Sequence, residues 1–363
     1  MKICFFSGDI TRSGGTERVA CMIANGLARQ GKFEVCILSL VEQADGKQPF
    51  FPLDPCITHE ALGERWIQPG PGYVPLIPKL RRFLKQRAID FVVDIDIVLD
   101  VLSVPAVCGR KTKVISWEHF SFGYETSVKY GYRNLILRHV TTKTDAVITL
   151  TERDRQAFLQ GLVPADKKVF RIHNPIGDTL RHTAEKKRWM ITVGRLAPEK
   201  GMDYLLHVAD LVLKKYPEWQ WLLLGDGEQR EWVEAQVRRR HLEQRLLLKG
   251  HVADVDAYLA QAQIFVLTSR REGLPMCLLE AKAHRLACVS FDIETGPDEI
   301  IEDGSSGFLI PPYDCEKMAD RIGQLIEDEK LRRMFMQNAE IGMEKFCMGT
   351  VLKQWNEVLK SLC

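Results

Sequence analysis

The sequence predicts an α/β protein built from two Rossmann-like domains. Short, nearly continuous apolar runs alternate with longer amphipathic segments along the chain. This alternation is typical of parallel strands that are buried on both faces and joined by helices. The 363 residues suit two domains of ordinary size. A net charge of +2, with 27% charged residues, gives no general indication of nucleic-acid binding.

Twelve apolar segments are predicted as strands, six in each half of the chain. They are 2–8, 33–40, 90–96, 112–118, 145–151 and 169–175 in the first half, and 189–195, 219–227, 245–251, 264–269, 286–291 and 307–311 in the second. The region 42–80 is rich in proline and glycine, so we expect irregular structure there.

The domain boundary is predicted between Asn174 and Arg188, where the sequence is polar and interrupted by proline and glycine. We therefore expect an N-terminal domain at 1–174, a linker at 175–188 and a second domain at 189–346. Residues 347–363 form an amphipathic pattern after the last predicted strand. We expect a crossover helix there that packs back on the first domain.

The cysteines and the N-terminus indicate a reducing compartment. None of the ten cysteines forms a Cys-x-x-Cys pair, which argues against a zinc site. The first apolar run ends after four residues, too early for a signal peptide. No segment has the roughly 18 consecutive apolar residues of a membrane span. We expect a cytoplasmic protein, located at the inner face of the cytoplasmic membrane if it contacts lipid.

Two loops of the sequence combine features that suit a diphosphate. Gly14 and Gly15 precede a predicted helix, whose N-terminal amides favour an anion. Arg195 and Lys200 follow a strand of the second half, at the edge where α/β sheets bind ligands. An ordinary strand-to-helix turn, or a solvated surface loop, would give the same residues.

The segment 271–281, REGLPMCLLEA, places two glutamates around a Gly-Leu-Pro turn. Glu280 lies within the apolar helix that follows, where an isolated carboxylate is costly. Carboxylates accept hydrogen bonds and sugar hydroxyls donate them. We interpret Glu272 and Glu280 as contacts to a sugar nucleotide. The alternative is a capping Glu272 with Glu280 paired to a buried arginine.

These motifs together resemble family four of the retaining glycosyltransferases. The ordered set comprises Gly14-Gly15, GR-x4-K at 194–200, LLGDG at 223–227, GHV at 250–252, EGLPMCLLEA at 272–281 and GP-x-EII-EDG-x-SGFLIPP at 296–312. The resemblance covers the whole second half and, more weakly, the first. It implies a hexosyltransferase with two Rossmann-like domains facing across a cleft. It also implies a nucleotide-sugar donor, usually a UDP-sugar, and retention of anomeric configuration.

The resemblance also implies a role for each matched residue. Arg195 and Lys200 would bind the diphosphate and act in catalysis, Glu280 would hold the ribose, and Glu272 would contact the transferred sugar. His119, after a strand of the first half, would lie near that sugar, although it also fits an ordinary buried histidine. The full expected donor site is Gly14, Gly15, Gly194, Arg195, Lys200, Gly225, Gly227, His251, Val252, Glu272, Gly273, Leu274, Pro275, Met276 and Glu280.

No metal or other cofactor is expected. Asp94 and Asp96 mimic the Asp-x-Asp pair that binds a divalent metal in the other transferase fold, but they end a strand far from the donor motifs. Alternating strand residues share a face, so we interpret this pair, with His119, as contacts to acceptor hydroxyls. A simple strand cap is the alternative. The resemblance attributes retention to same-face attack, with the donor phosphate accepting the acceptor's proton.

The class of acceptor is inferred from weaker features of the sequence. The first half looks most like bacterial transferases of lipopolysaccharide, O-antigen, capsule and exopolysaccharide synthesis, so a glycan or lipid-linked glycan is expected. Segments 78–87 and 129–143 are basic and partly apolar, which suits contact with an anionic membrane or a solvated helix face. A sugar-nucleotide 2-epimerase and a non-catalytic sugar-nucleotide-binding subunit remain alternatives. Nothing in the sequence fixes the oligomeric state.

Overall fold

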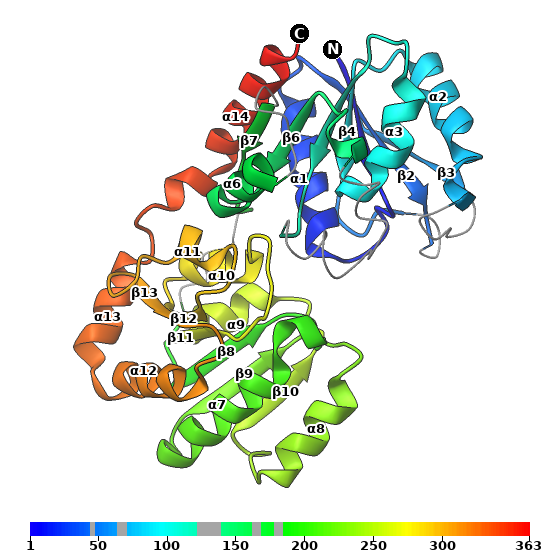
Figure 1. Cartoon of the computed structure of the whole chain (residues 1–363). Coiled ribbons are helices and arrows are strands. Elements are labelled where there is room, and N and C mark those ends of the chain that lie inside the picture. Colours follow the sequence, from blue (N-terminus) through cyan, green and yellow to red (C-terminus); the bar gives the residue numbers. More distant parts are fainter. Residues whose placement is uncertain (44–47, 64–70, 122–138, 162–167, 178–183) are drawn as a thin grey trace. The chain divides into compact units, whose positions relative to one another are not determined.

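The computed structural model describes residues 1–43, 48–63, 71–121, 139–161, 168–177 and 184–363. The chain divides into two compact units, each described separately (Figure 1). The first unit combines Met1–Gly177 with Phe346–Cys363, and the second is Asp178–Lys345. Each unit is organised around one parallel sheet, so the predicted α/β class with two Rossmann-like units is confirmed.

The first unit contains a seven-stranded sheet in the order β3-β2-β1-β4-β5-β6-β7. Its described strands and helices are β1 (Lys2–Ser7), α1 (Gly15–Arg29), β2 (Glu34–Val41), β3 (Thr58–Gly63), α2 (Leu76–Arg87), β4 (Phe91–Ile95), α3 (Asp100–Val107), β5 (Lys113–Trp117), β6 (Ala146–Thr149), α6 (Glu152–Gly161), β7 (Lys168–Arg171) and α14 (Met348–Ser361). Short 3-10 turns η2 (Pro71–Tyr73) and η3 (Ile97–Leu99) precede α2 and α3, and η7 (Met343–Phe346) leads to α14.

The second unit contains a six-stranded sheet in the order β10-β9-β8-β11-β12-β13. Its elements are β8 (Trp189–Val193), η6 (Pro198–Lys200), α7 (Met202–Lys215), β9 (Gln220–Leu224), α8 (Arg230–Arg239), β10 (Leu246–Gly250), α9 (Val255–Gln261), β11 (Ile264–Leu267), α10 (Met276–Ala283), β12 (Ala287–Phe291), α11 (Pro297–Ile300), β13 (Gly307–Ile310), α12 (Cys315–Glu327) and α13 (Glu329–Asn338). All pairings between neighbouring strands are parallel in both sheets.

Strand β3 differs from the sequence expectation. It lies within the region 42–80, where we expected irregular structure. The strand has the sequence THEALG and pairs only with β2, at the edge of the sheet. Its residues are exposed or half-buried, so the strand lacks the apolar run that marks the central strands.

Side chains of β1 alternate between two cores, which explains why helices cover both faces of the first sheet. Cys4 and Phe6 pack in a cluster with buried residues of α2 and α3. Phe5 points the other way and contacts Trp355 of α14, with ring centroids 6.0 Å apart. Period-two alternation in a strand produces this division. Every side chain of β1 from Ile3 to Phe6 is consequently buried.

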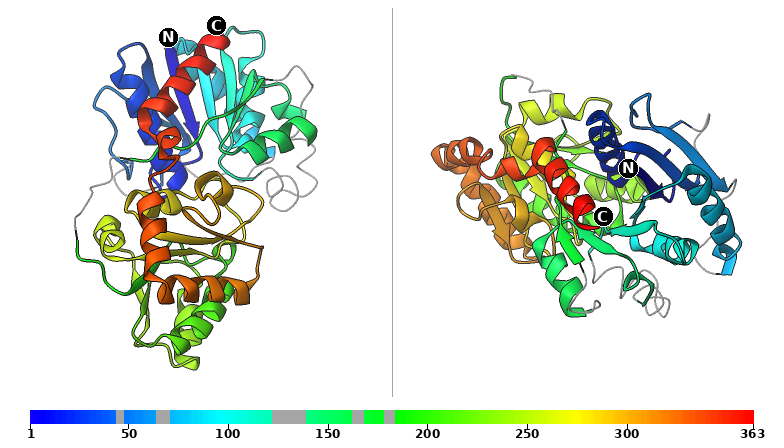
Figure 2. Two further views of the ribbon diagram at one scale, coloured as in Figure 1. Left: turned by 90° about the vertical axis from the view of Figure 1, so that its left-hand side faces the viewer. Right: turned by 90° about the horizontal axis from the view of Figure 1, so that it is seen from above.

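The C-terminal helix packs on the first unit, as expected from the sequence. Trp355 is fully buried and meets Trp117 edge-on, with ring centroids 4.9 Å apart. Gly26 of α1 allows the close approach of α14, because a Cβ at that position would lie 2.8 Å from Leu352. Figure 2 shows both chain ends at the same end of this unit, where Cys363 Sγ lies 3.5 Å from Met1 Sδ.

The core of the second unit follows the same principle. One buried cluster joins strand residues such as Met190, Trp221 and Leu223 to helices α7, α8, α12 and α13. The alternate residues Ile191 and Leu222 are equally buried but lie outside that cluster. The sheet is therefore covered on both faces, and ligands can reach its loops only at the edges.

Candidate functional site

Both sheets contain the strand-order reversal at which α/β proteins form ligand sites. In the second unit, β8 lies between β9 and β11, so the loops that follow β8 and β11 diverge at the carboxyl edge. The loop after β8 carries Gly194, Arg195 and Lys200, and the loop after β11 carries Glu272. The fold thus brings together motifs that are 72 residues apart.

Lys200 and Glu272 form the centre of this loop cluster. Lys200 Nζ donates to Glu272 Oε1 over 2.7 Å, and Ser269 Oγ donates to the same oxygen over 2.6 Å. Burial alone would lower the pKa of Lys200, but the charge and hydrogen bond of Glu272, together with the weaker influence of Cys277 and Glu199, outweigh burial, and the pKa is raised. The ammonium group therefore stays charged at neutral pH. The hydroxyl of Thr295 fixes the loop further by donating to the Glu272 carbonyl over 2.6 Å.

Arg195 lies near this pair in sequence but has a different environment. Its side chain is 61% exposed and forms an ion pair with Glu199. Partial burial opposes the ionisation of Glu199, but hydrogen bonds from its backbone and from Arg195 lower the pKa of Glu199. Glu199 is a residue that the sequence analysis did not single out. Glu199 pairs with the Arg195 guanidinium, which the sequence analysis assigned to a diphosphate. A diphosphate bound there would compete with the Glu199 carboxylate for Arg195.

The glycines at the strand ends serve close contact between loops. Gly225 has φ +131°, and a Cβ there would lie 1.9 Å from the Gly194 carbonyl oxygen. A Cβ on Gly227 would lie 2.5 Å from the carbonyl oxygen of Leu196. The resemblance placed Gly225 and Gly227 in the donor site. In the structure they approach the backbone of the β8 loop, which only glycine allows.

The EGLPM segment leads into α10, which begins at Met276 with Pro275 as its N-cap. A Cβ on Gly296 would lie 2.7 Å from the Gly273 oxygen, so the loop before α11 packs tightly on this turn. Leu274 is buried and Met276 is half-buried. The first amides of α10 point their partial positive charge towards the same sheet edge as Lys200.

Helix α10 carries two buried charged residues. Glu280 is 7% exposed. Lys282 is 1% exposed and donates to the Ile300 carbonyl over 2.9 Å and to Ser306 Oγ over 3.0 Å. The sequence analysis missed Lys282. Its side chain ties α10 to the end of α11 and to the loop that follows α11.

His251 and Val252 follow β10, the edge strand of the second sheet. His251 is exposed and Val252 is half-buried. Their loop is held to the β9 loop because the Gly225 amide donates to the Gly250 carbonyl over 2.8 Å. Neighbouring loops therefore link His251, through Gly225 and Gly194, to the Arg195 segment.

In the first unit, the N-terminus of α1 already holds a carboxylate. Gly14 precedes the helix and Gly15 begins it. A Cβ on Gly14 would lie 2.2 Å from Glu17 Oε2, so the Glu17 side chain folds back over the helix end. Burial raises the pKa of Glu17 although Arg12, 3.7 Å away, opposes this rise. The sequence analysis missed Glu17, although its position three residues after Gly14 is that of a capping glutamate.

Asp94 and Asp96 do not share a face of the first unit. Strand β4 ends at Ile95, and Asp96 has φ 90°, so the alternation expected for the pair stops before Asp96. Asp96 accepts a hydrogen bond from the Val98 amide over 3.1 Å. Asp94 is fully buried and accepts from Ser103 Oγ over 2.6 Å. This burial separates Asp94 from any acceptor, whereas Asp96 is half-buried at the strand end.

Asp94 belongs to a buried carboxyl pair. Asp100 is also fully buried, and its Oδ2 accepts from Ser116 over 2.9 Å and from Thr141 over 2.7 Å. Burial raises the pKa of Asp100 to about 7 and raises that of Asp94 well above its usual value. The charge of Asp100 raises the pKa of Asp94 further. Folding therefore favours the protonated form of Asp94.

This pair predicts a pH dependence of stability. A carboxyl whose pKa is raised by folding stabilises the protein below its unfolded pKa of about 4. That contribution is lost as the pH rises towards the folded pKa, which is about 7 for Asp100. In Asp94→Asn this position cannot ionise, so the unfolding free energy should fall less steeply between these pH values. Urea unfolding at several pH values measures how the unfolding free energy changes with pH. The control is Asp320→Asn at an exposed position. An equal pH dependence in the unmodified protein and both variants would contradict the pairing.

His119 follows β5 and is buried, with 6% exposure. Its ring lies 4.3 Å from that of Trp117, centroid to centroid. Burial lowers the pKa of His119 to about 3, so the imidazole is neutral at physiological pH. Within the described part of the chain, its Nε2 has no hydrogen-bond partner. A neutral imidazole with an unused nitrogen suits hydrogen bonding to a hydroxyl.

The described residues also bear on metal binding and on contact with a membrane. No group of three or more His, Cys, Asp or Glu side chains within the described ranges is arranged to hold a metal ion. None of the described helices is long and apolar enough to cross a membrane. Segment 78–87 forms most of α2, whose Leu80 and Leu84 are buried while Lys79, Arg82 and Lys85 are exposed. Most of segment 129–143 lies outside the described residues.

Both halves of the chain match known protein families. Residues 13–179 match the family described as Glycosyltransferase Family 4, and residues 181–341 match Glycosyl transferases group 1. The chain belongs to family four of the glycosyltransferases. The resemblance and the activity class predicted from the sequence are both confirmed.

Two relatives match this glycosyltransferase over nearly its whole length. An uncharacterized glycosyltransferase of Haemophilus influenzae is 29% identical over 99% of both chains. The amylovoran biosynthesis glycosyltransferase AmsD of Erwinia amylovora is 26% identical, again over 99% of both chains.

Solved structures resemble the glycosyltransferase at lower identity, which establishes the fold alone. Anabaena Alr3699/HepE, solved in complex with UDP, has a TM-score of 0.80 at 21% identity over 99% of this chain and 100% of that one. The lipopolysaccharide outer core galactosyltransferase WaaB has a TM-score of 0.78 at 21% identity over both whole chains. Some other matches are longer proteins: the chain spans 58% of the S. aureus TarM chain that it resembles, with a TM-score of 0.67 at 23% identity.

Proposed function

We propose that this glycosyltransferase moves a hexose from a UDP-sugar to a glycan or lipid-linked glycan, with retention of anomeric configuration. Galactose, glucose and N-acetylhexosamine are the sugars expected, in that order. The observation that carries the proposal is the 2.7 Å contact between Lys200 and Glu272 at the strand-order reversal of the second sheet. It places a permanent cation beside a hydrogen-bond acceptor, as a sugar diphosphate requires.

Under this proposal, the second unit binds the donor and the first binds the acceptor. Lys200 and Arg195 hold the diphosphate, and the first amides of α10 add positive potential. Glu280 accepts hydrogen bonds from the ribose hydroxyls, and the loops around Gly225 and His251 border the base. The complexes of HepE with UDP and with UDP-glucose support a UDP-sugar as the donor class.

Catalysis then rests on stabilising the departing nucleotide. Negative charge grows on the diphosphate as the glycosidic bond breaks, and preorganised cations lower the energy of that state. Lys200 is held in place by Glu272, so it needs little rearrangement. Arg195 must exchange Glu199 for the ligand, which its exposure permits. The two cations therefore differ: Lys200 is fixed in advance, and Arg195 is recruited by the ligand.

Retention is proposed to proceed by same-face attack. Glu272 is engaged by Lys200 and Ser269, which disfavours a role as a covalent nucleophile. The donor phosphate accepts the proton of the attacking hydroxyl as the new bond to the anomeric carbon forms and the bond to the diphosphate breaks. His119, with its neutral imidazole, and Asp96 contact the reacting sugars from the first unit. We propose that no metal takes part.

The proposal is tested by incubating the protein with UDP-, GDP- and ADP-sugars in EDTA and measuring nucleotide release and donor hydrolysis. We expect consumption of one UDP-sugar, unaffected by EDTA. Activity that disappears in EDTA and returns with Mg²⁺ or Mn²⁺ would contradict metal independence. Consumption of a GDP- or ADP-sugar alone would contradict the donor assignment.

The acceptor class rests on relatives and on surface charge. AmsD acts in amylovoran biosynthesis and WaaB on the lipopolysaccharide outer core. We propose that this enzyme likewise builds a bacterial surface polysaccharide or lipopolysaccharide, in the cytoplasm. The exposed cations Lys79, Arg82 and Lys85 of α2 would contact the anionic inner face of the membrane. Depleting anionic lipid from vesicles should then reduce co-sedimentation of the protein.

A further inference from the structure

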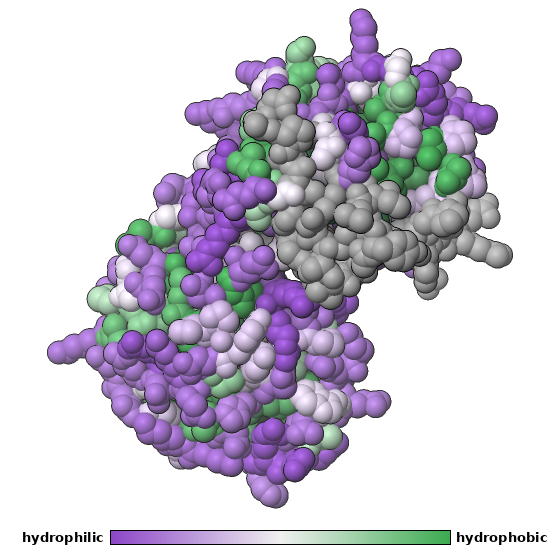
Figure 3. Space-filling view, viewed as in Figure 1, coloured by the Kyte–Doolittle hydropathy of each residue, from purple (hydrophilic) through white to green (hydrophobic). Residues whose placement is uncertain are grey.

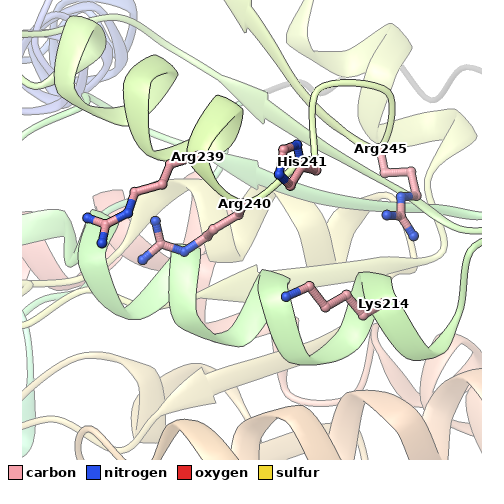
Figure 4. A pocket seen from close by; sticks show the side chains of 5 residues that line it. All are labelled: Lys214, Arg239, Arg240, His241 and Arg245. Carbon is pink, nitrogen blue, oxygen red and sulfur yellow. The ribbon is translucent and has the colours of Figure 1, made fainter.

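A hollow lined only by basic residues lies on the second unit, away from the loops described above. It has a volume of about 480 Å³ and is bordered by Lys214, Arg239, Arg240, His241 and Arg245 (Figure 4). Lys214 lies near the end of α7, before β9, and the others lie between α8 and β10. These segments lead into strands, so the hollow is at the amino edge of the sheet, opposite Lys200.

Two arginines of this hollow are held by neutral groups. Arg240 Nη1 donates to the Gln236 side-chain oxygen over 2.6 Å, and Arg245 Nη1 donates to the Leu213 carbonyl over 2.6 Å. Among the residues that the structure describes, no carboxylate forms an ion pair with Arg239, Arg240 or Arg245. Lys214 pairs with Asp210 over 2.9 Å. The guanidinium groups of Arg240 and Arg245 are thus held in position, and none of their partners among the described residues is a carboxylate.

The turn after α8 places these charges around one hollow. His241 adopts φ 56°, and the turn that it makes is closed by the Leu242 amide, which donates to the Val237 carbonyl over 3.1 Å. Figure 4 shows Arg239 and Arg240 at the end of α8, His241 on the turn and Arg245 just before β10, with Lys214 on the neighbouring helix α7. The surface over α7 and α8 is predominantly hydrophilic (Figure 3). Like charges in one hollow repel each other unless an anion joins them.

We propose that this hollow is a second anion site, which binds a phosphate-bearing group with at least two negative charges. Guanidinium forks bind phosphate oxygens in pairs, and a neighbouring ammonium adds a point charge. The volume lies within the usual range for small-molecule sites. The phosphate belongs either to a soluble metabolite or to a lipid headgroup, which present the same chemistry. The site goes beyond the proposed function and does not depend on the donor loops.

The test is calorimetric titration of the full-length protein with inorganic tripolyphosphate, in saturating UDP so that the donor loops are occupied. We expect one bound tripolyphosphate. Arg239→Gln/Arg240→Gln should weaken this binding by at least about tenfold, the loss of two charge-assisted contacts. The matched control is Arg238→Gln/Lys249→Gln, which removes the same charge from a neighbouring hollow. The control should bind tripolyphosphate as the unmodified protein does.

Vesicle sedimentation distinguishes the two sources of phosphate. If vesicles of phosphatidylcholine with phosphatidic acid retain the protein but not Arg239→Gln/Arg240→Gln, the ligand is a lipid headgroup. If tripolyphosphate binds and these vesicles do not, the ligand is soluble.

Two results would overturn the site: equally weakened tripolyphosphate binding in the variant and in the matched control, or no tripolyphosphate bound in the presence of UDP. If the variant fails to fold, Lys214→Gln/Arg239→Gln, at two exposed positions, replaces it. UDP binding is measured separately, so failure of the donor assignment is recognised independently.

Discussion

Replacing Lys200 by alanine is expected to reduce turnover by about 10²- to 10³-fold, the cost of removing one preorganised group that stabilises a developing anion. Lys200 is the cation that the structure fixes in advance, through its 2.7 Å contact with Glu272. Its removal takes away positive charge at the diphosphate and leaves the Glu272 carboxylate without its counterion. Donor binding should therefore weaken as well. Steady-state kinetics with the consumed UDP-sugar measure both effects.

Two further variants make this result specific. Lys330→Ala removes the same charge from an exposed position of the second unit and should keep full activity. Arg195→Ala should cost about 10²-fold, because Arg195 also contacts the diphosphate but starts from an exposed ion pair with Glu199. Normal turnover in Lys200→Ala, with the fold intact by circular dichroism, would remove Lys200 from the mechanism.

Trp355→Ala is expected to destabilise the first unit by about 3–5 kcal/mol, the usual cost of removing a large buried aromatic side chain. Trp355 is fully buried in α14 and contacts both Trp117 and Phe5. Trp117 in turn lies beside His119, with ring centroids 4.3 Å apart. Loss of Trp355 should therefore loosen the C-terminal helix and disturb the position of His119.

Chemical unfolding followed by circular dichroism tests this expectation. Lys353→Ala is the matched control, since it changes an exposed residue of the same helix and should alter the unfolding free energy by less than about 0.5 kcal/mol. If Trp355→Ala unfolds at the same denaturant concentration as the unmodified protein, α14 does not contribute to the core of the first unit.

The sequence predicted the central strands because their burial leaves a direct signal. Every strand buried on both faces, from β1 to β13, coincides with an apolar run. Strand β3 was missed because an edge strand needs no such run, and THEALG carries none. The start of α2 was also not predicted. Its buried Leu80 and Leu84 follow a helical spacing, but the proline- and glycine-rich residues before them obscured where the helix begins.

At the site, the sequence predicted residues better than it predicted their partners. It singled out Lys200 and Glu272 separately, and only the fold shows that they meet. It could not foresee that Glu199 occupies Arg195 or that Glu17 covers the start of α1, because such contacts depend on side-chain conformation. Asp94 was assigned to an acceptor because alternation was extended past Ile95, where the strand ends.

The arginines of the basic hollow were overlooked for a related reason. Arg238, Arg239 and Arg240 are consecutive at the end of α8 and read as a solvated helix face. Only the turn at His241 brings Arg240 and Arg245 together with Lys214 of another helix. A site formed by charges from separate elements leaves no spacing for a motif to reveal.

We propose above all that the carboxyl edge of the second sheet binds the UDP part of a sugar nucleotide. Its most direct test is calorimetric titration of UDP into the unmodified protein and into Glu280→Gln and Lys200→Ala. We predict one UDP bound by the unmodified protein and at least about tenfold weaker binding in each variant. UDP binding that is absent from the unmodified protein, or unchanged in both variants, would contradict the claim.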